Sequence, residues 1–262
     1  MMKPTIGIAL GSGGAKGFAH AGVLRVLEAE GIAIDYLAGS SIGALVCALY
    51  SVGHRYDSMY KMAMTFKREH YLDFIFPRMG FVSGKKVTSL IKAITHNKTF
   101  KDCQTPLKIV ATDLLAGERV VFDEGYLYEA VRASISIPGI FTPVKKNGRL
   151  LVDGGVIDRV PVTVVKDMGA DIVIGVDVAR FKRQPEISSI YDVIMQSIDI
   201  MQEEMVKSQE LNADVVIRPN VGQFHSKAFT SIDEIIKIGE DTAREQLPEI
   251  LNAIKNWKEQ SI

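Results

Sequence analysis

A serine at position 41 lies in the pattern G-x-S-x-G, which residues 39–43 satisfy as Gly-Ser-Ser-Ile-Gly. In this pattern a sharp turn from a strand into a helix strains the serine backbone and leaves its hydroxyl projecting. Side chains two residues to either side would collide, so Gly39 and Gly43 are needed there. The start of the helix would also place N–H groups near developing negative charge. We interpret Ser41 as a candidate nucleophile; the alternative is a turn that merely joins a strand to a helix.

Residues 11–17, Gly-Ser-Gly-Gly-Ala-Lys-Gly, follow a predicted strand and open a helix, and we call them the glycine loop. A dinucleotide site would need an acidic residue at the end of the second strand, where the chain reads Ala-Gly-Ser. A phosphate loop is excluded by its spacing. An oxyanion hole fits, because adjacent parallel strands would bring the N–H groups of Gly13 and Gly14 beside Ser41. A simple tight turn is the alternative, and four glycines within seven residues weaken it.

The serine also needs a base. Asp153 follows an apolar strand and precedes Gly154 and Gly155, and burial would raise its pKa and improve it as a base. A triad in the chain order Ser, Asp, His would instead nominate His225, which lies in a polar segment typical of a surface loop. His20 is better explained as a packing or capping residue of the glycine loop. Taken alone, Asp-Gly-Gly is also typical of a simple turn, so the residues leave both bases open.

The elements that must position these residues alternate between strand and helix. Strands are predicted at 5–10, 34–38, 107–114, 119–122, 141–144, 150–152, 172–176 and 215–218, with a hairpin from 107–114 to 119–122. Helices are predicted from about 17 to 31, over 42–52, over 55–95 with a break at 76–80, over 126–133 and 190–211, and over 231–257 with a break near Pro248. This alternation predicts one domain over residues 1–262, with a mainly parallel sheet covered on both faces.

Composition narrows the class of protein. Lys+Arg and Asp+Glu are both 31, so the formal net charge is zero, which argues against nucleic acid as a partner. Two cysteines, Cys47 and Cys103, with no Cys/His cluster argue against a disulfide framework and structural zinc, and fit a reducing cytoplasm. Residues 32–52 are long and apolar enough to cross a bilayer, but Gly-Ser-Ser interrupts them. A buried strand and helix fit better, and we expect a soluble protein.

Taken together, the glycine loop, the G-x-S-x-G pattern and Asp153-Gly-Gly, in this order, resemble the bacterial patatin-like phospholipases, the family that includes the neuropathy-target-esterase-like proteins. Residues 111–114 and 130–141 are also similar to family segments. The resemblance implies a three-layer α/β/α sandwich and a lipid acyl hydrolase with a Ser–Asp dyad and no histidine, metal or nucleotide cofactor. It implies that the site comprises Ser41 as nucleophile, Asp153 as base, Gly13 and Gly14 as oxyanion hole, and Gly11, Lys16, Gly17, Gly39, Gly43, Gly154 and Gly155 in support.

Lys16 stands where many family members have arginine, which puts a bidentate grip on phosphate or carboxylate in doubt. The aromatic-rich residues 71–82 are either a wall for the acyl chain, a face that enters lipid at the membrane surface, or an ordinary core element. A noncatalytic regulatory or scaffold protein with the same fold is the alternative from another class, and the retained serine, aspartate and glycines speak against it.

Overall fold

The computed structural model describes residues 3–65, 73–76, 79–179, 187–209, 212–224 and 231–260. A central sheet has the strand order β10-β9-β1-β2-β4-β8-β7, and β5 also pairs with β4. A separate short pair joins β3 to β6. The strands are β1 (Ile6–Leu10), β2 (Tyr36–Ser40), β3 (Gly80–Val82), β4 (Leu107–Asp113), β5 (Glu118–Phe122), β6 (Gly139–Phe141), β7 (Val144–Lys146), β8 (Arg149–Asp153), β9 (Ile172–Val176) and β10 (Val215–Ile217).

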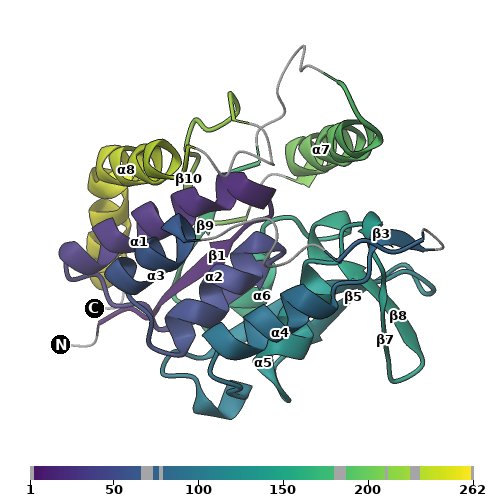
Figure 1. The fold of residues 1–262 in the computed structure, drawn as a ribbon. Helices are drawn as coiled ribbons and strands as arrows, with labels where there is room; N and C mark the ends of the chain where they lie inside the picture. The colour runs from purple at the N-terminus through teal and green to yellow at the C-terminus, as the bar shows by residue number, and fades with distance from the viewer. Residues whose placement is uncertain are drawn as a thin grey trace.

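Helices cover both faces of the central sheet, as Figure 1 shows. They are α1 (Phe18–Ala29), α2 (Ile42–Ser51), α3 (Tyr56–Met64), α4 (Lys85–Ile94), α5 (Leu127–Ser134), α6 (Val162–Asp167), α7 (Ile190–Gln209) and α8 (Ile232–Gln260), with short 3-10 turns η1 (Gly14–Gly17), η3 (Phe100–Asp102) and η4 (Gly154–Val156). The side that carries α1, α2, α5 and α8 holds the main core, to which the strands contribute large side chains such as Ile8, Leu37 and Ile109. Alternate strand residues such as Ala9 and Ala38 face α6 on the opposite side. The predicted three-layer α/β/α sandwich is confirmed.

The direction of the strands changes at β4. Strands β1, β2, β4, β9 and β10 are parallel, as predicted, and β4 and β5 form the predicted hairpin. Strand β8 runs antiparallel to β4, and β7 runs antiparallel to β8. Because β5 pairs with residues 109–113 along one edge of β4, β2 and β8 share the other edge, opposite residues 107–110 and 111–113 respectively. The carboxyl ends of β2 and β8 therefore approach each other along this edge.

The prediction for residues 55–95 was correct for the helices α3 and α4 and wrong for the segment between them. Residues 66–72 and 77–78 lie outside the described part of the chain. Gly80–Val82 forms a strand instead of continuing a helix, because its backbone pairs with residues 139–141. Phe74 also forms a bridge to Val82. The pairing partner is some 60 residues away along the chain, so local periodicity could not reveal it.

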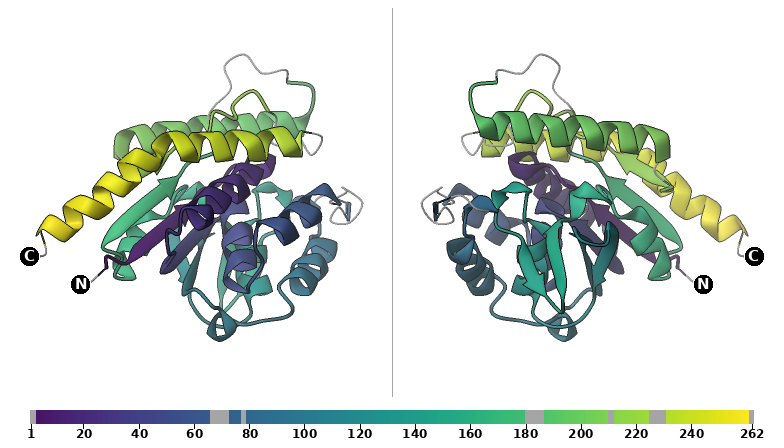
Figure 2. Two further views of the ribbon diagram at one scale, coloured as in Figure 1. Left: turned by 90° about the vertical axis from the view of Figure 1, so that its left-hand side faces the viewer. Right: turned by 90° about the vertical axis from the view of Figure 1, so that its right-hand side faces the viewer.

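The predicted break near Pro248 was also wrong, since α8 runs from Ile232 to Gln260 with Pro248 inside it. A proline within a helix removes one hydrogen bond and bends the axis without necessarily ending the helix. Figure 2 shows that α8 changes direction along its length. Ala243 and Ile250, before and after the proline, are both fully buried in the main core, so packing maintains the helix through the bend.

Residues 32–52 contain the predicted strand and helix, now observed as β2 and α2. Among the described helices, none combines the length and the apolar character needed to cross a bilayer.

Candidate active site

Ser41 occupies the turn between β2 and α2 with φ 54° and ψ −123°. A positive φ is uncommon for a residue with a side chain, so the predicted strain at this turn is confirmed. A Cβ atom on Gly43 would lie 2.1 Å from the carbonyl oxygen of Leu10, and one on Gly39 would lie 2.6 Å from the backbone of Ala44. Both glycines are therefore required by close packing, and Gly43 in particular allows α2 to approach the end of β1.

The glycine loop lies beside this turn because β1 and β2 are adjacent parallel strands, with Leu10 opposite Gly39. Gly11 donates its N–H to the carbonyl of Val176, at 3.0 Å, which holds the start of the loop against β9. Gly14 has φ 57°, a conformation that favours glycine. A Cβ atom on Gly17 would lie 2.4 Å from the side chain of Ile42, so this glycine lets η1 pack against the start of α2.

His20 fixes the loop from below, as predicted. Its Nε2 lies 2.9 Å from the carbonyl oxygen of Gly11, and this contact requires Nε2 to carry the proton and donate it. Burial lowers the pKa of His20 to about 4, so the ring is neutral. It therefore supports the loop and is not available as a base.

Gly13 and Gly14 both line the pocket that contains Ser41. Within the described ranges, neither amide donates to a protein acceptor. Both glycines are partly buried, so their amides are accessible from the pocket. Two such donors beside a serine could receive an oxygen atom of a bound molecule.

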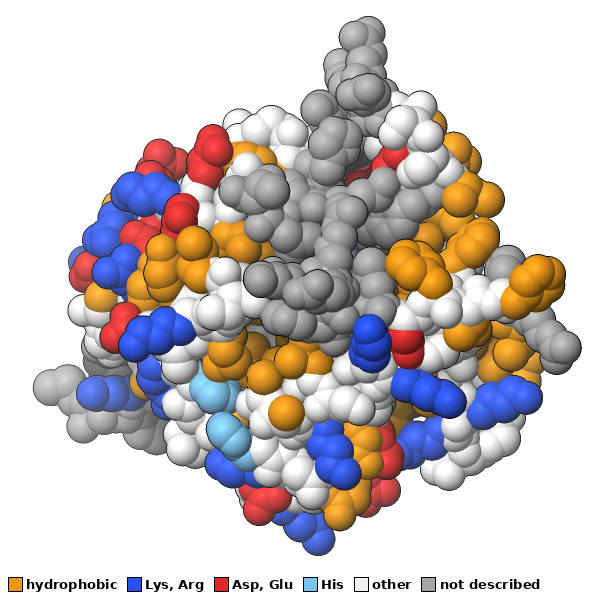
Figure 3. Space-filling model, viewed as in Figure 1, with side chains coloured by type: hydrophobic (Ala, Val, Ile, Leu, Met, Phe, Trp, Pro, Cys, Tyr) orange, Lys and Arg blue, Asp and Glu red, His pale blue; other side chains and the backbone are white. Residues whose placement is uncertain are grey.

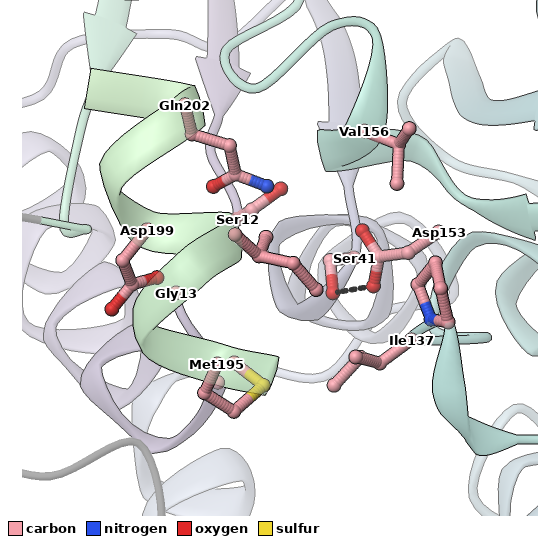
Figure 4. A pocket seen from close by; sticks show the side chains of 12 residues that line it. Ser12, Gly13, Ser41, Ile137, Asp153, Val156, Met195, Asp199 and Gln202 are labelled. Carbon is pink, nitrogen blue, oxygen red and sulfur yellow. Dashed lines mark hydrogen bonds between the residues drawn. The ribbon is translucent and has the colours of Figure 1, made fainter. Parts of the chain in front are cut away.

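Asp153 meets Ser41 because the ends of β8 and β2 converge along β4, at Ala111 and Val110 respectively. The Ser41 hydroxyl donates to Asp153 Oδ2 at 2.5 Å, the dashed contact in Figure 4. The other carboxylate oxygen, Oδ1, accepts the N–H of Gly155 at 2.8 Å. The two side chains that the sequence separated by more than 100 residues are thus in direct contact.

Burial raises the pKa of Asp153 to about 7, and the hydrogen bonds from Ser41 and Gly155 oppose that rise. The side chain is only 5% exposed. The two glycines after Asp153 are needed for this packing. A Cβ atom on Gly154 would lie 2.3 Å from the carbonyl oxygen of Val110, and one on Gly155 would lie 2.3 Å from Oγ of Ser12.

The end of α5 holds both halves of the pair, a role that sequence reasoning missed. Ser134 accepts the N–H of Ser41 at 2.8 Å and donates its hydroxyl to the carbonyl of Val110 at 2.6 Å. The carbonyl of Ser136 accepts the N–H of Asp153 at 3.0 Å. These serines lie in the 130–141 segment of the resemblance, but nothing in their spacing indicates which backbone groups they bind.

Helix α7 covers the pocket and was also missed. Figure 4 shows Met195 and Gln202 of this helix on one side of the Ser41–Asp153 pair and Ile137 and Val156 on the other, and Asp199 of the helix also lines the pocket. Met195, Asp199 and Gln202 recur at helical spacing, which indicated only one side of a helix. The lining residues are Ser12, Gly13, Gly14, Ser41 and Asp153 at the base, Ile137, Pro138 and Val156 at the side, and Met195, Ile198, Asp199 and Gln202 on α7.

Lys16 does not face an open anion site. Its ammonium group is buried and lies 3.5 Å from the carboxylate of Asp199 on α7. Burial raises the pKa of Asp199, while the charge of Lys16 opposes the rise. Lys16 thus contributes to the attachment of α7.

The remaining site expectations have mixed outcomes. His225 lies outside the described residues, as do Tyr71, Leu72, Pro77 and Arg78 of the aromatic segment. In the part of that segment that is described, Val82 is in the core whereas Phe74 and Phe76 are exposed. Across the described ranges, no three His, Cys, Asp or Glu side chains form a group that could hold a metal ion.

The chain combines a layered α/β/α fold with a serine at a strand-to-helix turn, in contact with an aspartate. This combination can be compared with known protein families. The model of the patatin-like phospholipase family matches residues 8–166, more than half of the chain. The chain belongs to the patatin-like phospholipase family, as its motifs predicted.

Relatives of known name agree with this assignment. An NTE family protein of Mycobacterium bovis is 38% identical over 177 residues, which are 66% of this chain and 49% of the relative. Patatin-like phospholipase domain-containing protein 7 of Mus musculus is 30% identical over 89% of this chain and 20% of its own length. Lysophospholipase NTE1 of Scheffersomyces stipitis is 25% identical over 91% of this chain and 18% of its own length. The chain thus spans about half, or less, of the length of these relatives.

Solved structures share the fold at low sequence identity. VipD from Legionella pneumophila matches 94% of this chain and 67% of its own with a TM-score of 0.58 and 14% identity. The type III effector ExoU matches 95% of this chain and 53% of its own with a TM-score of 0.53 and 14% identity. These likenesses support the fold alone.

Proposed function

We propose that this protein hydrolyses lipid esters through an acyl-enzyme formed on Ser41. The observation that carries the proposal is the 2.5 Å contact between the Ser41 hydroxyl and a buried Asp153 carboxylate. A serine hydroxyl is a weak nucleophile until a neighbouring base accepts its proton. Asp153 is the group in position to do so, and its raised pKa makes it a stronger base than an ordinary aspartate.

In the proposed first step, Asp153 takes the proton of Ser41 while Oγ bonds to the ester carbonyl carbon. The carbonyl oxygen becomes an anion and accepts the N–H groups of Gly13 and Gly14. Each such donor contributes about 3 kcal/mol to the stability of a transition state. Collapse of the tetrahedral intermediate breaks the bond to the alcohol, which leaves with the proton from Asp153. Water then gives a proton to Asp153, attacks the acyl-enzyme, and releases the acid with Ser41 restored.

The proposed substrates are phospholipids or lysophospholipids. The names of the relatives support this class of substrate. The pocket also presents apolar side chains, Ile137, Val156, Met195 and Ile198, beside Ser41, and these suit an acyl chain. We propose that the protein works in the cytoplasm and contacts membranes at their surface, where such substrates reside.

Fluorophosphonate labelling tests the nucleophile. We expect the probe to modify Ser41 in the wild type and to leave Ser41→Ala unmodified, with hydrolysis of a mixed lipid extract lost in parallel. Ser51→Ala is the matched control, because Ser51 is also fully buried at the far end of α2 and should not affect labelling. Labelling of Ser41→Ala at another serine, with activity retained, would refute the assignment.

A second experiment distinguishes the dyad from a triad. Asp153→Asn should reduce kcat by about 10⁴-fold, the scale seen when an essential group of a serine hydrolase is removed. His225→Ala should retain activity. The wild-type kcat/KM should rise with pH and level off above about 7, because Asp153 must be ionised to act as a base. Activity that survives in Asp153→Asn and is lost in His225→Ala would favour the triad.

A further inference from the structure

Helix α7 is apolar on two opposite sides. Met195 and Ile198 face the pocket together with Asp199 and Gln202. Four other large apolar side chains are exposed, Ile190 by 62%, Val193 by 51%, Ile200 by 44% and Met201 by 58%. At about 100° per residue these four lie on one side of the helix, together with the exposed Ser197 and Glu204, and opposite the pocket-facing four. A helix at a protein surface normally has one apolar side, so the outer side of α7 lacks an explanation in the fold.

The inner side of α7 closes the pocket and is attached by polar contacts. Gln202 donates to the carbonyl of Gly155 at 2.8 Å, and Asp199 pairs with Lys16 at 3.5 Å. Ser41 and Asp153 are only 6% and 5% exposed beneath this helix. Because α7 forms one wall of the pocket over these two residues, it narrows the path by which a lipid ester would approach Ser41.

The exposed side of α7 lies next to a second exposed apolar group at the β3 end of the molecule. Phe74 is 74% exposed and Phe76 is 89% exposed, and Met79 nearby is half exposed. Ile194 of α7 packs against Gly139 of β6, the strand that pairs with β3, so the two groups are neighbours. Figure 3 shows hydrophobic side chains gathered on this side of the molecule. Exposed apolar surface on the helix that forms a wall of this pocket matches a lipid surface.

Charge narrows the kind of surface. Residues 190–206 of α7 contain four acidic residues and no lysine or arginine. Two of the four, Asp199 and Glu203, pair with Lys16 and Arg159 of the protein, whereas Glu204 is exposed on the outer side. Anionic lipid headgroups attract basic segments, so they would repel the outer side of α7 at Glu204. A zwitterionic surface imposes no such repulsion.

We propose that α7 is a mobile cover whose outer side, with Phe74 and Phe76, binds a zwitterionic lipid surface, and that this binding releases its inner side and opens the pocket over Ser41. The inference rests on the proposed function, since it concerns access to the same serine. The energy gained by burying the outer side in lipid offsets the loss of the contacts of Asp199, Gln202 and Glu203 with the rest of the protein. The protein therefore reacts slowly with single molecules in solution and faster at a lipid surface.

The rate at which a fluorophosphonate labels Ser41 measures this opening. Vesicles of ether-linked phosphatidylcholine provide the surface, because their ether bonds cannot be hydrolysed and so do not compete for the serine. We expect the vesicles to accelerate labelling about tenfold, equivalent to ~1.4 kcal/mol. The double variant Ile190→Asp with Met201→Asp should keep the vesicle-free rate and lose the acceleration. Gln202→Met, which removes an inner contact, should be labelled faster without vesicles.

Each other result overturns the inference. Equal labelling of Ser41 with and without vesicles would refute the cover while leaving the proposed function intact. Acceleration by anionic phosphatidylglycerol vesicles alone would refute the choice of surface. Acceleration by raising the protein concentration without vesicles would assign the outer side of α7 to a second copy of the chain. Absence of labelling at Ser41 under all conditions, and also in Gln202→Met, would refute both the cover and the proposed function.

Discussion

The floor of the pocket and the helix that covers it are held in place in different ways. The floor, formed by Ser41, Asp153 and the glycine loop, lies at the ends of β1, β2 and β8, where backbone groups approach so closely that several positions accept only glycine. The cover, α7, contacts the floor of the pocket through a few side chains and leaves several apolar residues exposed. Figure 2 shows α7 lying across the strand ends, outside the layer of α1 and α2. This difference matches the roles proposed for the two regions, because groups that react need a rigid backbone, whereas access needs an element that can move away.

The largest stability effect is expected at Gly43. Gly43→Ala places a Cβ atom 2.1 Å from the carbonyl oxygen of Leu10, and neither backbone can yield without separating α2 from β1. We expect a loss of about 3 kcal/mol or more in the free energy of unfolding, measured by urea denaturation. Gly31→Ala is the control, because Gly31 has φ 68° but open space around it, so it carries only backbone strain. Equal losses of unfolding free energy in the two variants would show that the floor of the pocket is not closely packed.

The second expected effect concerns Asp153 and pH. Its folded pKa of about 7 exceeds the ordinary 3.8, so the folded state binds more protons than the unfolded state between these values. The contribution of Asp153 to stability therefore falls as pH rises from about 4 to 7. Asp153→Asn avoids this penalty, and its stability relative to the wild type should be roughly 2 to 3 kcal/mol more favourable at pH 8 than at pH 5. Urea denaturation at both pH values measures this difference in stability. A difference that does not change with pH would contradict a buried carboxyl group with a raised pKa.

A smaller effect is expected at Ser134, which joins α5 to the floor of the pocket. Ser134→Ala leaves the buried N–H of Ser41 and the carbonyl of Val110 without this partner, at a cost of about 1 to 3 kcal/mol. It should also lower kcat with little change in KM, because the position of Ser41 is disturbed and the pocket walls are not. Ser51→Ala is the control, since the Ser51 hydroxyl is buried without a hydrogen-bond partner in the described structure. Unchanged kcat in Ser134→Ala would show that the turn holds Ser41 unaided.

The smallest effect concerns the cover itself and requires no mutation. Amide hydrogen exchange of α7 should be faster than that of α2, because α2 is almost wholly buried against the sheet and α7 is not. Local opening of a weakly attached element needs less free energy than global unfolding. Hydrogen-exchange mass spectrometry of the intact chain measures both helices together. Equal protection of α7 and α2 would show that the cover is as rigid as the floor of the pocket, and would contradict the difference between the two regions.

Most of the fold could be predicted from short-range patterns. The apolar runs at β1, β2, β4 and β9 and the hairpin of β4 and β5 were visible in the sequence because buried strands need such runs. The strand at Gly80–Val82 and the unbroken α8 were mispredicted, because a distant partner strand and core packing around Pro248 overrode the local signals. The motifs also indicated the residues of the pocket floor, since glycines are required wherever backbones nearly touch.

The sequence alone determined that Ser41 lies at a glycine-flanked turn and that Asp153 ends a strand, because these are properties of a few adjacent residues. Only the tertiary structure decided that the two meet. That contact depends on β8 reversing direction and ending opposite Ala111, on the same edge of β4 where β2 ends opposite Val110. The cover was likewise decided in three dimensions, since a helix with two apolar sides does not state in its sequence which side faces a pocket.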